Sequence, residues 1–383
     1  MCVSHNEGVS ALGIPSTVVS HAAAVAAEIR SLAGIFVDTD QMLTGRARLL
    51  GISPRGQVSA GGATHLLRTL DHWCAITLSR DDDVDAVPAL VEQDQTAAPD
   101  PWPTVQRWAA TRSTAQVVQR ARLLDVPVAA LGETAPASPT VLSSGVVGAP
   151  RPAAGLLVAD LTSMWAGPLC GRLLARAGAV VVKVESPLRP DGTRSGNRAF
   201  FDWMNGDKLS YAIDFDRDLE ALRGLLSTSD VILEGSRPAA LLRRRIGPSH
   251  LDGKPGRVWL RISGYGTRQG NDQRPAFGDD AAVAGGLVRW AANKPVLCGD
   301  AIADPLTGIT AAREVFAALR RGGGELIEVA MAEVAASYAA LPAVVGVPHA
   351  TSVPPKPSMP AHELGADNDV VTRLVVERTQ SRC

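Results

Sequence analysis

The chain has 383 residues, 46% of them hydrophobic, and is therefore long enough for two or three domains with sizeable cores. Its formal net charge of −1 excludes the strongly basic surface with which proteins bind nucleic acids or anionic membranes. Aromatic residues make up only 4% of the chain, so the cores must be filled by Ala, Val and Leu.

The cysteines are scattered and form no CxxC pair, which argues against a zinc site and against a disulfide framework. We therefore expect no bound metal and a location in the reducing cytoplasm. The N-terminus lacks a basic segment followed by an apolar run, so no signal peptide is expected. The best candidate for a membrane span, 326–347, is interrupted by Glu328 and Glu333. The cysteines are Cys2, Cys74, Cys170, Cys298 and Cys383.

The pattern of residues 1–131 predicts a small α+β domain. Apolar residues recur at the helical period in 21–33, and a turn at Asp71-His72 between two short apolar runs predicts a hairpin. The helix dipole stabilises acidic residues at the start of a helix. We therefore interpret the acids 81–83 as a solvated helix start rather than as a metal site. The other expected elements are helices over 39–50, 81–91, 102–111 and 115–124 and strands over 66–70, 73–78 and 126–131.

A Pro/Ser/Gly/Ala-rich stretch over 132–152 predicts a linker between two domains. From 153 to 345, apolar strands alternate with amphipathic helices, which predicts a doubly wound, Rossmann-like α/β domain with a parallel sheet. Residues 346–383 are expected to form a tail that packs back on this large domain. The expected strands are 156–161, 179–185, 231–234 and 257–263, with helices over 169–177 and 219–226.

Several common catalytic motifs are missing. The turn after the first strand of the large domain contains Gly167-Pro-Leu-Cys-Gly171 instead of GxGxxG, and Pro168 removes a backbone N–H that would bind phosphate. There is no GxxxxGK[ST] loop, and Ser263 does not stand in a GxSxG elbow. No two histidines are four residues apart, as a zinc protease requires. These absences argue against NAD, P-loop and common hydrolase chemistry.

Asp304 stands between small and apolar residues, just before a segment, 307–320, that predicts a helix. A carboxylate in apolar surroundings is costly to keep charged unless a partner compensates it. Asp is also a favoured N-cap residue. The residues alone therefore leave two interpretations open, a functional acid and a helix cap.

Seven segments, in the same order and at similar spacings, resemble the class III CoA-transferases. That family includes formyl-CoA transferase, carnitine CoA-transferase and α-methylacyl-CoA racemase. Each segment is a weak signal alone, but their common order is specific, and the resemblance covers most of 155–340. The segments are 158–168 with 173–185, 190–194, 205–210 with 213–214, 229–234 with 237–238, 262–266, 278–280 and 302–308, and 363–371 resembles the family's tail.

Residues 58–131 resemble the family's small domain. In the usual order, that domain lies between the core of the large domain and the tail, whereas here it precedes the core. The resemblance therefore implies a rearranged chain, which is tolerable where domain boundaries are exposed. It also implies an interlocked homodimer.

By this resemblance, Asp304 matches the family's catalytic aspartate. Such a carboxylate attacks the thioester of an acyl-CoA, takes up CoA as an aspartyl thioester and passes it to an acceptor carboxylic acid. The resemblance thus implies a CoA-transferase with an acyl-CoA and a carboxylic acid as partners. CoA is then a substrate, and no permanently bound cofactor is expected.

The resemblance implies three CoA-binding positions. Ala166 lies in the loop after the first strand, where the family contacts CoA. Arg194 matches an arginine that meets the CoA nucleotide, and Arg243 is the member of the run 243–245 that matches another. For this run, a solvated helix C-terminus is an equal alternative.

Two alternatives to a transferase remain open. Racemases of the family use a histidine for proton transfer just before the position of Asp280, where this chain has Asp279. A catalytically silent CoA-binding scaffold is favoured by the altered 205–210 motif and the rearranged order, and disfavoured by Asp304. Asp279 and Asp280 are expected to form either a structural cap or a like-charge pair with one raised pKa.

Overall fold

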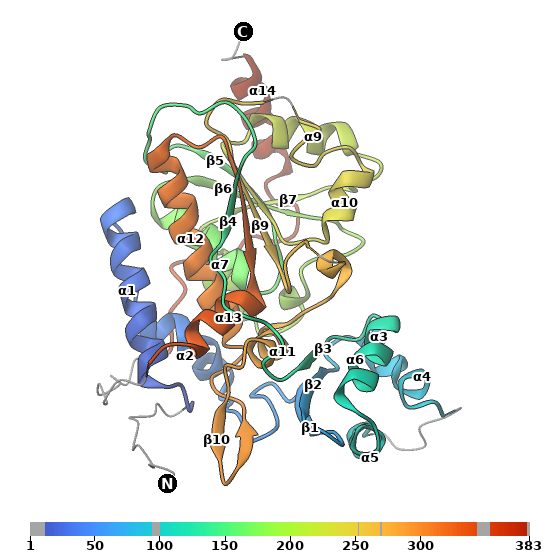
Figure 1. Cartoon of the computed structure of the whole chain (residues 1–383). Coiled ribbons are helices and arrows are strands. Elements are labelled where there is room, and N and C mark those ends of the chain that lie inside the picture. The colour runs from blue at the N-terminus through green and yellow to red at the C-terminus, as the bar shows by residue number, and fades with distance from the viewer. Residues whose placement is uncertain (1–11, 94–99, 252, 269, 343–352, 381–383) are drawn as a thin grey trace.

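A computed structural model describes residues 12–93, 100–251, 253–268, 270–342 and 353–380. Its central sheet contains seven strands (Figure 1). In spatial order these are β4 (Thr140–Ser143), β12 (Glu325–Ala330), β9 (Val258–Ser263), β8 (Val231–Glu234), β5 (Leu157–Leu161), β6 (Val180–Glu185) and β7 (Leu209–Ala212). Every neighbouring pair is parallel except β4 and β12, which are antiparallel.

The order of the parallel strands is that of the Rossmann fold. β5 is the first of the parallel strands along the chain. β6 and β7 follow on one side of it, and β8, β9 and β12 then follow on the other side. The direction of winding therefore reverses between β5 and β8, and ligands of such sheets bind outside the carboxyl ends of the strands at this point. The predicted doubly wound α/β class is confirmed.

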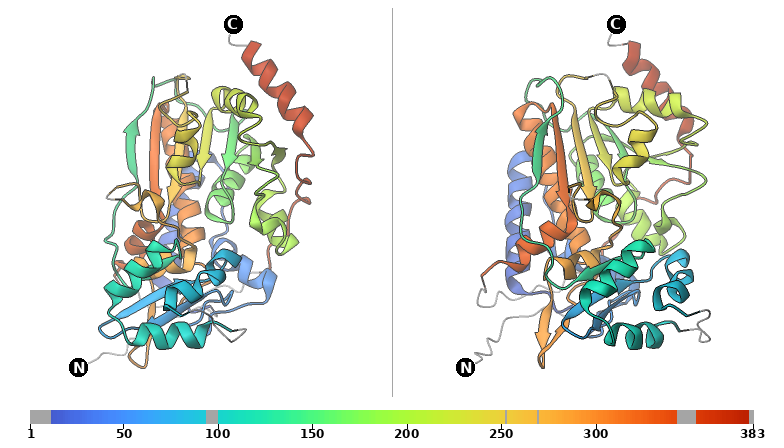
Figure 2. Two further views of the ribbon diagram at one scale, coloured as in Figure 1. Left: turned by 90° about the vertical axis from the view of Figure 1, so that its right-hand side faces the viewer. Right: turned by 45° about the vertical axis from the view of Figure 1, so that its right-hand side comes forward.

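Helices cover both faces of the sheet (Figures 1 and 2). On one face, α7 (Ala166–Arg176) and α12 (Ala303–Arg321) lie against each other, with α11 (Gly278–Ala284) and α13 (Met331–Ala339) next to them. The other face is covered by α9 (Leu219–Thr228), α10 (Pro238–Arg243) and α14 (Asn368–Gln380). Two short elements, η1 (Gly192–Arg194) and α8 (Arg198–Asn205), link β6 to β7, and η2 (Asn271–Gln273) follows β9. Because both faces are buried, strands such as β8 are almost wholly apolar.

The predicted hairpin and its closing strand form a second, smaller sheet. Because side chains alternate along a strand, Leu67 faces a small core of its own while Leu66 faces the large one. This sheet lies beside α11, near the carboxyl ends of the large sheet (Figure 1). Its elements are β1 (Thr64–Arg68), β2 (Trp73–Thr77), β3 (Val128–Ala130), α3 (Asp81–Asp85), α4 (Val87–Val91), α5 (Trp102–Ala110) and α6 (Thr114–Leu123).

The first two helices, α1 (Ser16–Ala33) and α2 (Thr39–Leu50), form as the sequence predicts but pack elsewhere. The sequence pattern predicts that they belong to a small domain over 1–131, whereas their buried residues belong to the core of the large sheet. The reason is that the apolar stripe of α1, which includes Val18, Val25 and Ile29, packs against α12. The division into domains at 131 and 152 stays a prediction.

The segment 132–152, predicted as a linker, contributes β4 to the edge of the large sheet. Its Val141 and Leu142 pair with Ile327 and Leu326 of β12. A small hairpin of β10 (Arg289–Ala291) and β11 (Lys294–Val296) projects from the molecule (Figure 1). Across the described residues, no helix is both long and apolar enough to cross a membrane.

Candidate active site

Asp304 lies in the first turn of α12. The helix begins at Ala303 rather than at 307, and its N-cap is Ile302, so the interpretation of Asp304 as the cap is wrong. A negative charge in the first turn is favoured by the helix dipole. The residue is partly exposed. The carboxylate is therefore electrostatically supported, although it is largely removed from water.

Burial, with smaller contributions from the nearby Asp300 and Asp280, raises the pKa of Asp304 to about 7. Arg46 and the backbone N–H of Ala166 oppose these effects. The pKa of an ordinary aspartate is near 4, so this carboxyl group changes its charge near neutral pH instead. Perturbed acids of this kind are typical of functional sites.

Two glycines let the starts of three helices meet at Asp304. A Cβ atom on Gly278, the first residue of α11, would overlap Oδ2 of Asp304 and the carbonyl oxygen of Ala301. A Cβ atom on Gly308, one turn after Asp304, would lie 2.8 Å from the carbonyl oxygen of Ala166. Glycine at these positions therefore permits the close approach of α11 and α7 to the start of α12.

Asp280 is fully buried and acts as a structural cap. It accepts hydrogen bonds from the backbone N–H of Phe277 (2.9 Å), the hydroxyl of Thr77 (3.0 Å) and the hydroxyl of Tyr265 (3.2 Å). Burial raises its pKa to about 6. Since Thr77 ends β2, Asp280 also ties the small sheet to α11.

Asp279 and Asp300 add further negative charge beside Asp304. Asp279 accepts a hydrogen bond from the backbone N–H of Ala301 (3.0 Å), and burial together with Asp300 raises its pKa to about 7. Burial also raises the pKa of Asp300. Of the two interpretations left open for 279–280, the structural cap holds for Asp280, whereas a like-charge pair with one raised pKa does not describe the pair, because burial raises the pKa values of both acids. Within the described ranges, no three acids are arranged to hold a metal ion.

Arg46 of α2 is a site residue that the sequence did not indicate. Its Nη1 lies 2.5 Å from Oδ1 of Asp300. Its guanidinium carbon lies 5.7 Å from the ring centre of Trp165 and 5.6 Å from that of Phe200. No motif marks Arg46, because it meets its partners only through the packing of α2 on the large domain.

Polar atoms around Asp304 are left without partners. Among the described residues, Nε1 of Trp165, Oδ2 of Asp300 and Oγ1 of Thr307 are buried and accept or donate no hydrogen bond. Buried polar atoms are usually paired, so unpaired ones need an explanation such as a ligand or ordered water. Trp165 precedes Ala166, and Thr307 follows Asp304 by one turn. The immediate surroundings of the carboxylate are therefore suited to a polar guest.

The loop after β5 holds Ala166 beside Asp304. Its Met164 has a positive φ of 73°, and the backbone N–H of Met164 donates to the buried Asp191. Lys183 bonds both Asp191 (2.7 Å) and the carbonyl oxygen of Thr162, so an ion pair fixes both ends of the turn. The sequence-predicted Ala166 and Asp304 are thus brought together.

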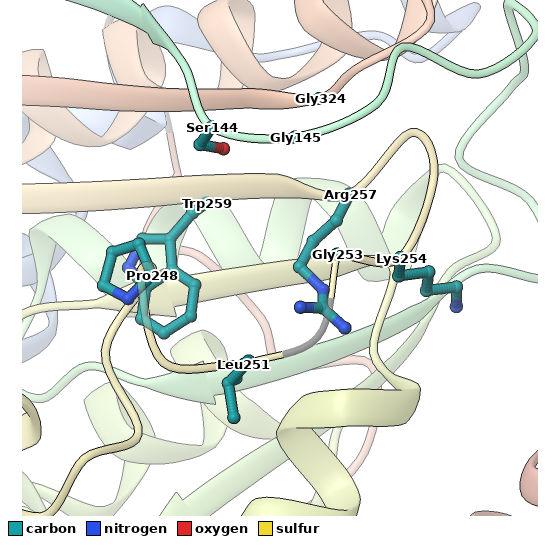
Figure 3. A pocket seen from close by; sticks show the side chains of 9 residues that line it. All are labelled: Ser144, Gly145, Pro248, Leu251, Gly253, Lys254, Arg257, Trp259 and Gly324. Carbon is teal, nitrogen blue, oxygen red and sulfur yellow. The ribbon is translucent and has the colours of Figure 1, made fainter.

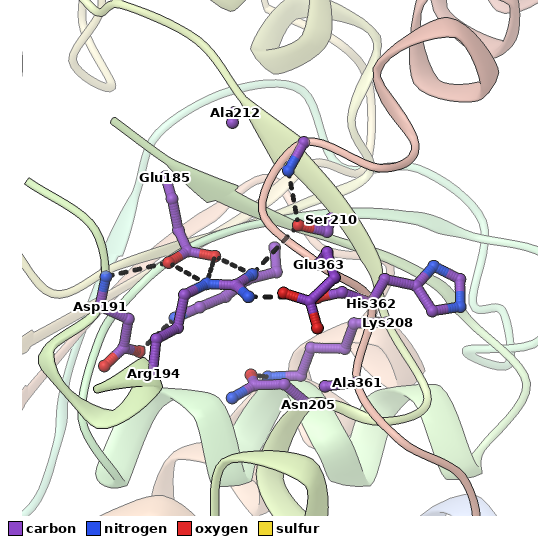
Figure 4. Close-up of polar contacts among 12 residues, drawn as sticks. Glu185, Asp191, Arg194, Asn205, Lys208, Ser210, Ala212, Ala361, His362 and Glu363 are labelled. Carbon is purple, nitrogen blue, oxygen red and sulfur yellow. Dashed lines mark hydrogen bonds and ion pairs between the residues drawn. The ribbon is translucent and has the colours of Figure 1, made fainter. Parts of the chain in front are cut away.

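Arg194, the second predicted CoA contact, is committed to the interior of the large domain (Figure 4). Its guanidinium donates to Glu185 at 2.7–3.0 Å and to the hydroxyl of Ser210, and it lies over the ring of Phe201. It also donates to the carbonyl oxygen of His362 in the C-terminal tail (3.1 Å). Its role toward CoA stays a prediction.

Arg243, the third predicted contact, is exposed in the last turn of α10. This helix covers the face of the sheet opposite to α12, so the structure does not bring Arg243 to Asp304. Its neighbour Arg244 is paired with Asp216 (2.7 Å). A CoA contact of Arg243 therefore also stays a prediction.

A small hollow elsewhere in the molecule is a poor candidate for the site (Figure 3). It lies where β9 and β12 begin, at the edge opposite to the one that binds ligands in this fold. Its cations are engaged, since Lys254 pairs with Asp230 (2.5 Å) and Arg257 bonds the carbonyl oxygen of Ser227 (2.6 Å). It is lined by Ser144, Gly145, Pro248, Leu251, Gly253, Lys254, Arg257, Trp259 and Gly324.

Comparison with known proteins finds a family match that includes Asp304 and its neighbours in the sequence. The profile of CoA-transferase family III matches residues 154–363, more than half of the chain. A probable fatty acyl-CoA transferase of Mycobacterium tuberculosis is 29% identical over 227 residues, which cover 54% of this chain and 57% of the relative. A succinyl-CoA–D-citramalate CoA-transferase of Chloroflexus aurantiacus is 29% identical over 201 residues, covering 48% and 50%.

A solved structure is also similar in sequence. The crystal structure of a hypothetical protein from Mycobacterium tuberculosis is 29% identical, covers 50% of this chain and 56% of that chain, and has a TM-score of 0.45. The chain spans about half the length of the curated relatives it matches. Arg46 and Thr77 lie outside the matched segment, whereas Asp279, Asp300 and Asp304 lie inside it.

Proposed function

The chain belongs to CoA-transferase family III, and on this premise we propose that it moves coenzyme A from an acyl-CoA to a carboxylic acid through covalent intermediates on Asp304. The placement of Asp304 is the main support for this proposal. It is a carboxylate of a partly exposed residue inside the matched segment, in the first turn of α12, and burial raises its pKa to about 7. A desolvated carboxylate is a better nucleophile than one fully hydrated in water.

In the first half-reaction, a carboxylate oxygen of Asp304 attacks the carbonyl carbon of the thioester. The carbon–sulfur bond breaks, CoA leaves as a thiolate, and a mixed anhydride forms between Asp304 and the acyl group. The thiolate then attacks the carbonyl carbon of Asp304. The donor leaves as a free carboxylate, and Asp304 is left as a thioester of CoA.

In the second half-reaction, the acceptor carboxylate attacks this aspartyl thioester. CoA leaves again as a thiolate and a new mixed anhydride forms. Attack of the thiolate on the acceptor's carbonyl carbon yields the new acyl-CoA and restores the carboxylate of Asp304. No proton is gained or lost over the cycle, so the site needs an ionised acid and no separate general base.

The residues around Asp304 have roles that suit these steps. The backbone N–H of Ala166 faces the carboxylate and lowers its pKa, so it can also donate to the oxyanion that forms when the Asp304 carbonyl is attacked. The first turn of α12 adds its dipole to the same charge. Ala166 is thus proposed as a CoA-side contact, together with Arg194 and the exposed Arg243 for the nucleotide phosphates.

A catalytically silent CoA-binding scaffold is the second candidate. It is favoured by one observation, the commitment of Arg194 to Glu185, Ser210 and the tail instead of to an open phosphate site. A racemase is less favoured, because Asp279 is bonded to the backbone of Ala301 and stands where a proton-transferring histidine would be needed.

The deciding experiment is intact-mass analysis of the protein after mixing with a panel of acyl-CoA thioesters. We expect a mass increase of one CoA or one acyl group in the wild type and none in Asp304→Asn, which keeps the size of the side chain. Asp85→Asn, which changes an exposed acid of α3, is the control and should form the adduct as the wild type does.

The outcomes separate the candidates. An adduct that Asp304→Asn abolishes supports the transferase. CoA binding by calorimetry without an adduct from any donor favours the scaffold. Exchange of the α-hydrogen of a branched acyl-CoA for deuterium, without an adduct, would favour the racemase and contradict the transferase.

We also propose a homodimer and a cytoplasmic location. The resemblance to the family is the support for the dimer, and the free, buried thiols of Cys74, Cys170 and Cys298 support the location. Size-exclusion chromatography with light scattering tests the first proposal. A solution mass of a single chain at micromolar concentration would contradict the dimer.

A further inference from the structure

The charges around Asp304 are strongly unbalanced. Asp279 and Asp280 face it from the start of α11, and Asp300 faces it from the turn before α12. Each of these acids is buried or partly buried, so water screens their mutual repulsion poorly. Four acids this close cannot all be ionised without a compensating cation.

In the described part of the chain, two cations face this cluster: Arg274 opposes the raised pKa of Asp280, and the other three acids are faced by Arg46. It opposes the raised pKa values of Asp279, Asp300 and Asp304, which places it within electrostatic reach of all three. Its bond to Oδ1 of Asp300 is 2.5 Å long, and the side chain of Asp300 is only 1% exposed. The side chain of Arg46 is 26% exposed, so one part of it reaches the acids while another part meets solvent.

Two aromatic rings and a close helix contact fix the position of Arg46. The guanidinium carbon lies within 6 Å of the ring centres of both Trp165 and Phe200, the range in which a cation is attracted to an aromatic face. The preceding residue is Gly45, where a Cβ atom would lie 2.7 Å from the ring of Trp203. The absence of a side chain at position 45 therefore lets α2 come close enough to α8 for Arg46 to reach Asp300.

We propose that Arg46 is a positioning residue for Asp304: anchored by Asp300, it balances the negative charges at the starts of α11 and α12, so that Asp304 remains ionised and able to attack. The inference deepens the transferase proposal and rests on it for the attacking role. The residue belongs to α2, outside the matched segment 154–363, so the N-terminal helices supply part of the active site.

The charge balance has a direct chemical consequence. Attack uses only the ionised form of Asp304, and an opposite charge at this range lowers the pKa of a carboxylate by about 1–3 units. Without Arg46, Asp304 would hold its proton to higher pH. The reaction would then be slow at neutral pH but would recover in alkaline solution, whereas a merely structural defect would not recover.

The experiment measures the ionisation of Asp304 in two ways. Carbodiimide labelling of Asp304, mapped by peptide mass spectrometry between pH 5 and 9, reports the protonated carboxyl without any substrate. The rate of adduct formation with acyl-CoA over the same range reports the reactive carboxylate. The variants are Arg46→Met and Arg46→Lys, with Arg48→Met as the control because Arg48 lies on the same helix and bonds Thr44 and Asp40.

For Arg46→Met, we expect both profiles to move to higher pH by about one unit or more, with adduct formation about tenfold slower at pH 6 and within about twofold of wild type at pH 9. Arg46→Lys keeps the charge and should recover most of the shift. Arg48→Met should match the wild type. Arg46→Gln also removes the positive charge but keeps a hydrogen-bond donor toward Asp300, so it is a second neutral variant, with the same expected direction of shift, should Arg46→Met not fold.

The outcomes distinguish the role of Arg46 from the transferase activity itself. Unchanged labelling profiles in Arg46→Met, or a rate loss that is the same at every pH, would overturn the role of Arg46. A shifted labelling profile in a protein that forms no adduct at any pH would support the charge balance and overturn the transferase. Shifts in both profiles support both.

Discussion

At the scale of single residues, the carboxylate of Asp304 lowers the stability of the folded chain when it is ionised. Burial raises the pKa of Asp304 from 3.8 to about 7, so between these values the folded chain holds a proton that the unfolded chain has lost. Stability therefore falls as pH rises from about 4 to about 7, and the loss is complete above the folded pKa. Residues selected for chemistry rather than packing commonly have such a cost.

The substitution Asp304→Asn tests whether the charge of Asp304 lowers the free energy of unfolding. At pH 8 it removes a charge from a poorly hydrated site, so we expect the free energy of unfolding to rise by about 2 kcal/mol or more. At pH 4 the gain should nearly vanish, because Asp304 is then protonated in the folded chain and half protonated in the unfolded chain. Urea unfolding at pH 4, 6 and 8 measures this gain in the free energy of unfolding, with Asp85→Asn, a substitution of an exposed acid, as the control. Equal gains at pH 4 and pH 8 would show that the effect comes from packing rather than from charge.

At the scale of elements, buried ion pairs shape the turn between β5 and α7. Asp160, at the end of β5, pairs with Lys208 (2.8 Å), and both side chains are almost fully buried. Lys208 also donates to the carbonyl oxygen of Pro168 in α7 (2.9 Å) and to Asn205 (2.9 Å). The altered 205–210 motif, which favoured a silent protein at the sequence level, is therefore used to hold the loop that carries Ala166.

Removing one partner of this pair leaves an uncompensated buried charge. For Lys208→Met we expect a loss of about 3–5 kcal/mol in the free energy of unfolding, because Asp160 keeps its charge in a site without water. The double substitution Asp160→Asn with Lys208→Met should regain much of this loss. Urea unfolding measures both, and Lys294→Met provides an exposed lysine for comparison. A double variant less stable than Lys208→Met would contradict the charge argument.

The elements themselves were largely predictable. Helix 39–50 and strand 231–234 agree with α2 and β8 at both ends, because apolar periodicity and the Gly51 stop define them. The start of α12 was placed too late, since Ala303 to Leu306 have no helical stripe of their own and form helix only against α7 and α11. β4 was missed because its Thr-Val-Leu-Ser sequence becomes a strand only by pairing with the free edge of β12.

At the scale of the whole molecule, the site combines parts that are remote in sequence. Asp304 comes from the matched segment, Arg46 from α2, and Thr77, which bonds Asp280, from the small sheet. The order of motifs along the chain could indicate Asp304 and Ala166, because each lies within a short sequence motif. It could not indicate Arg46, whose bond to Asp300 spans 254 positions and depends on how α2 packs. Composition and periodicity do not encode such a contact.

The C-terminal tail completes the large sheet by covering the open edge of β7. The side chain of Asn368 bonds both the N–H and the carbonyl oxygen of Ala212 at 2.9 Å, as a neighbouring strand would. Asp367 accepts a bond from the N–H of Ser210 (2.7 Å), and Val371 is fully buried against α9. An uncovered edge strand is a template for pairing with other chains.

We therefore expect a chain that stops after residue 360 to melt at a lower temperature and to aggregate, because it loses the buried Val371 and exposes the N–H and carbonyl groups of β7. Thermal unfolding with simultaneous light scattering measures both effects. A chain that stops after residue 380 keeps α14 and should behave as the full chain does. Asn368→Ala removes only the edge bonds and should increase aggregation more than it lowers the melting temperature. A chain ending at 360 that melts and scatters light as the full chain does would show that the tail does not protect this edge.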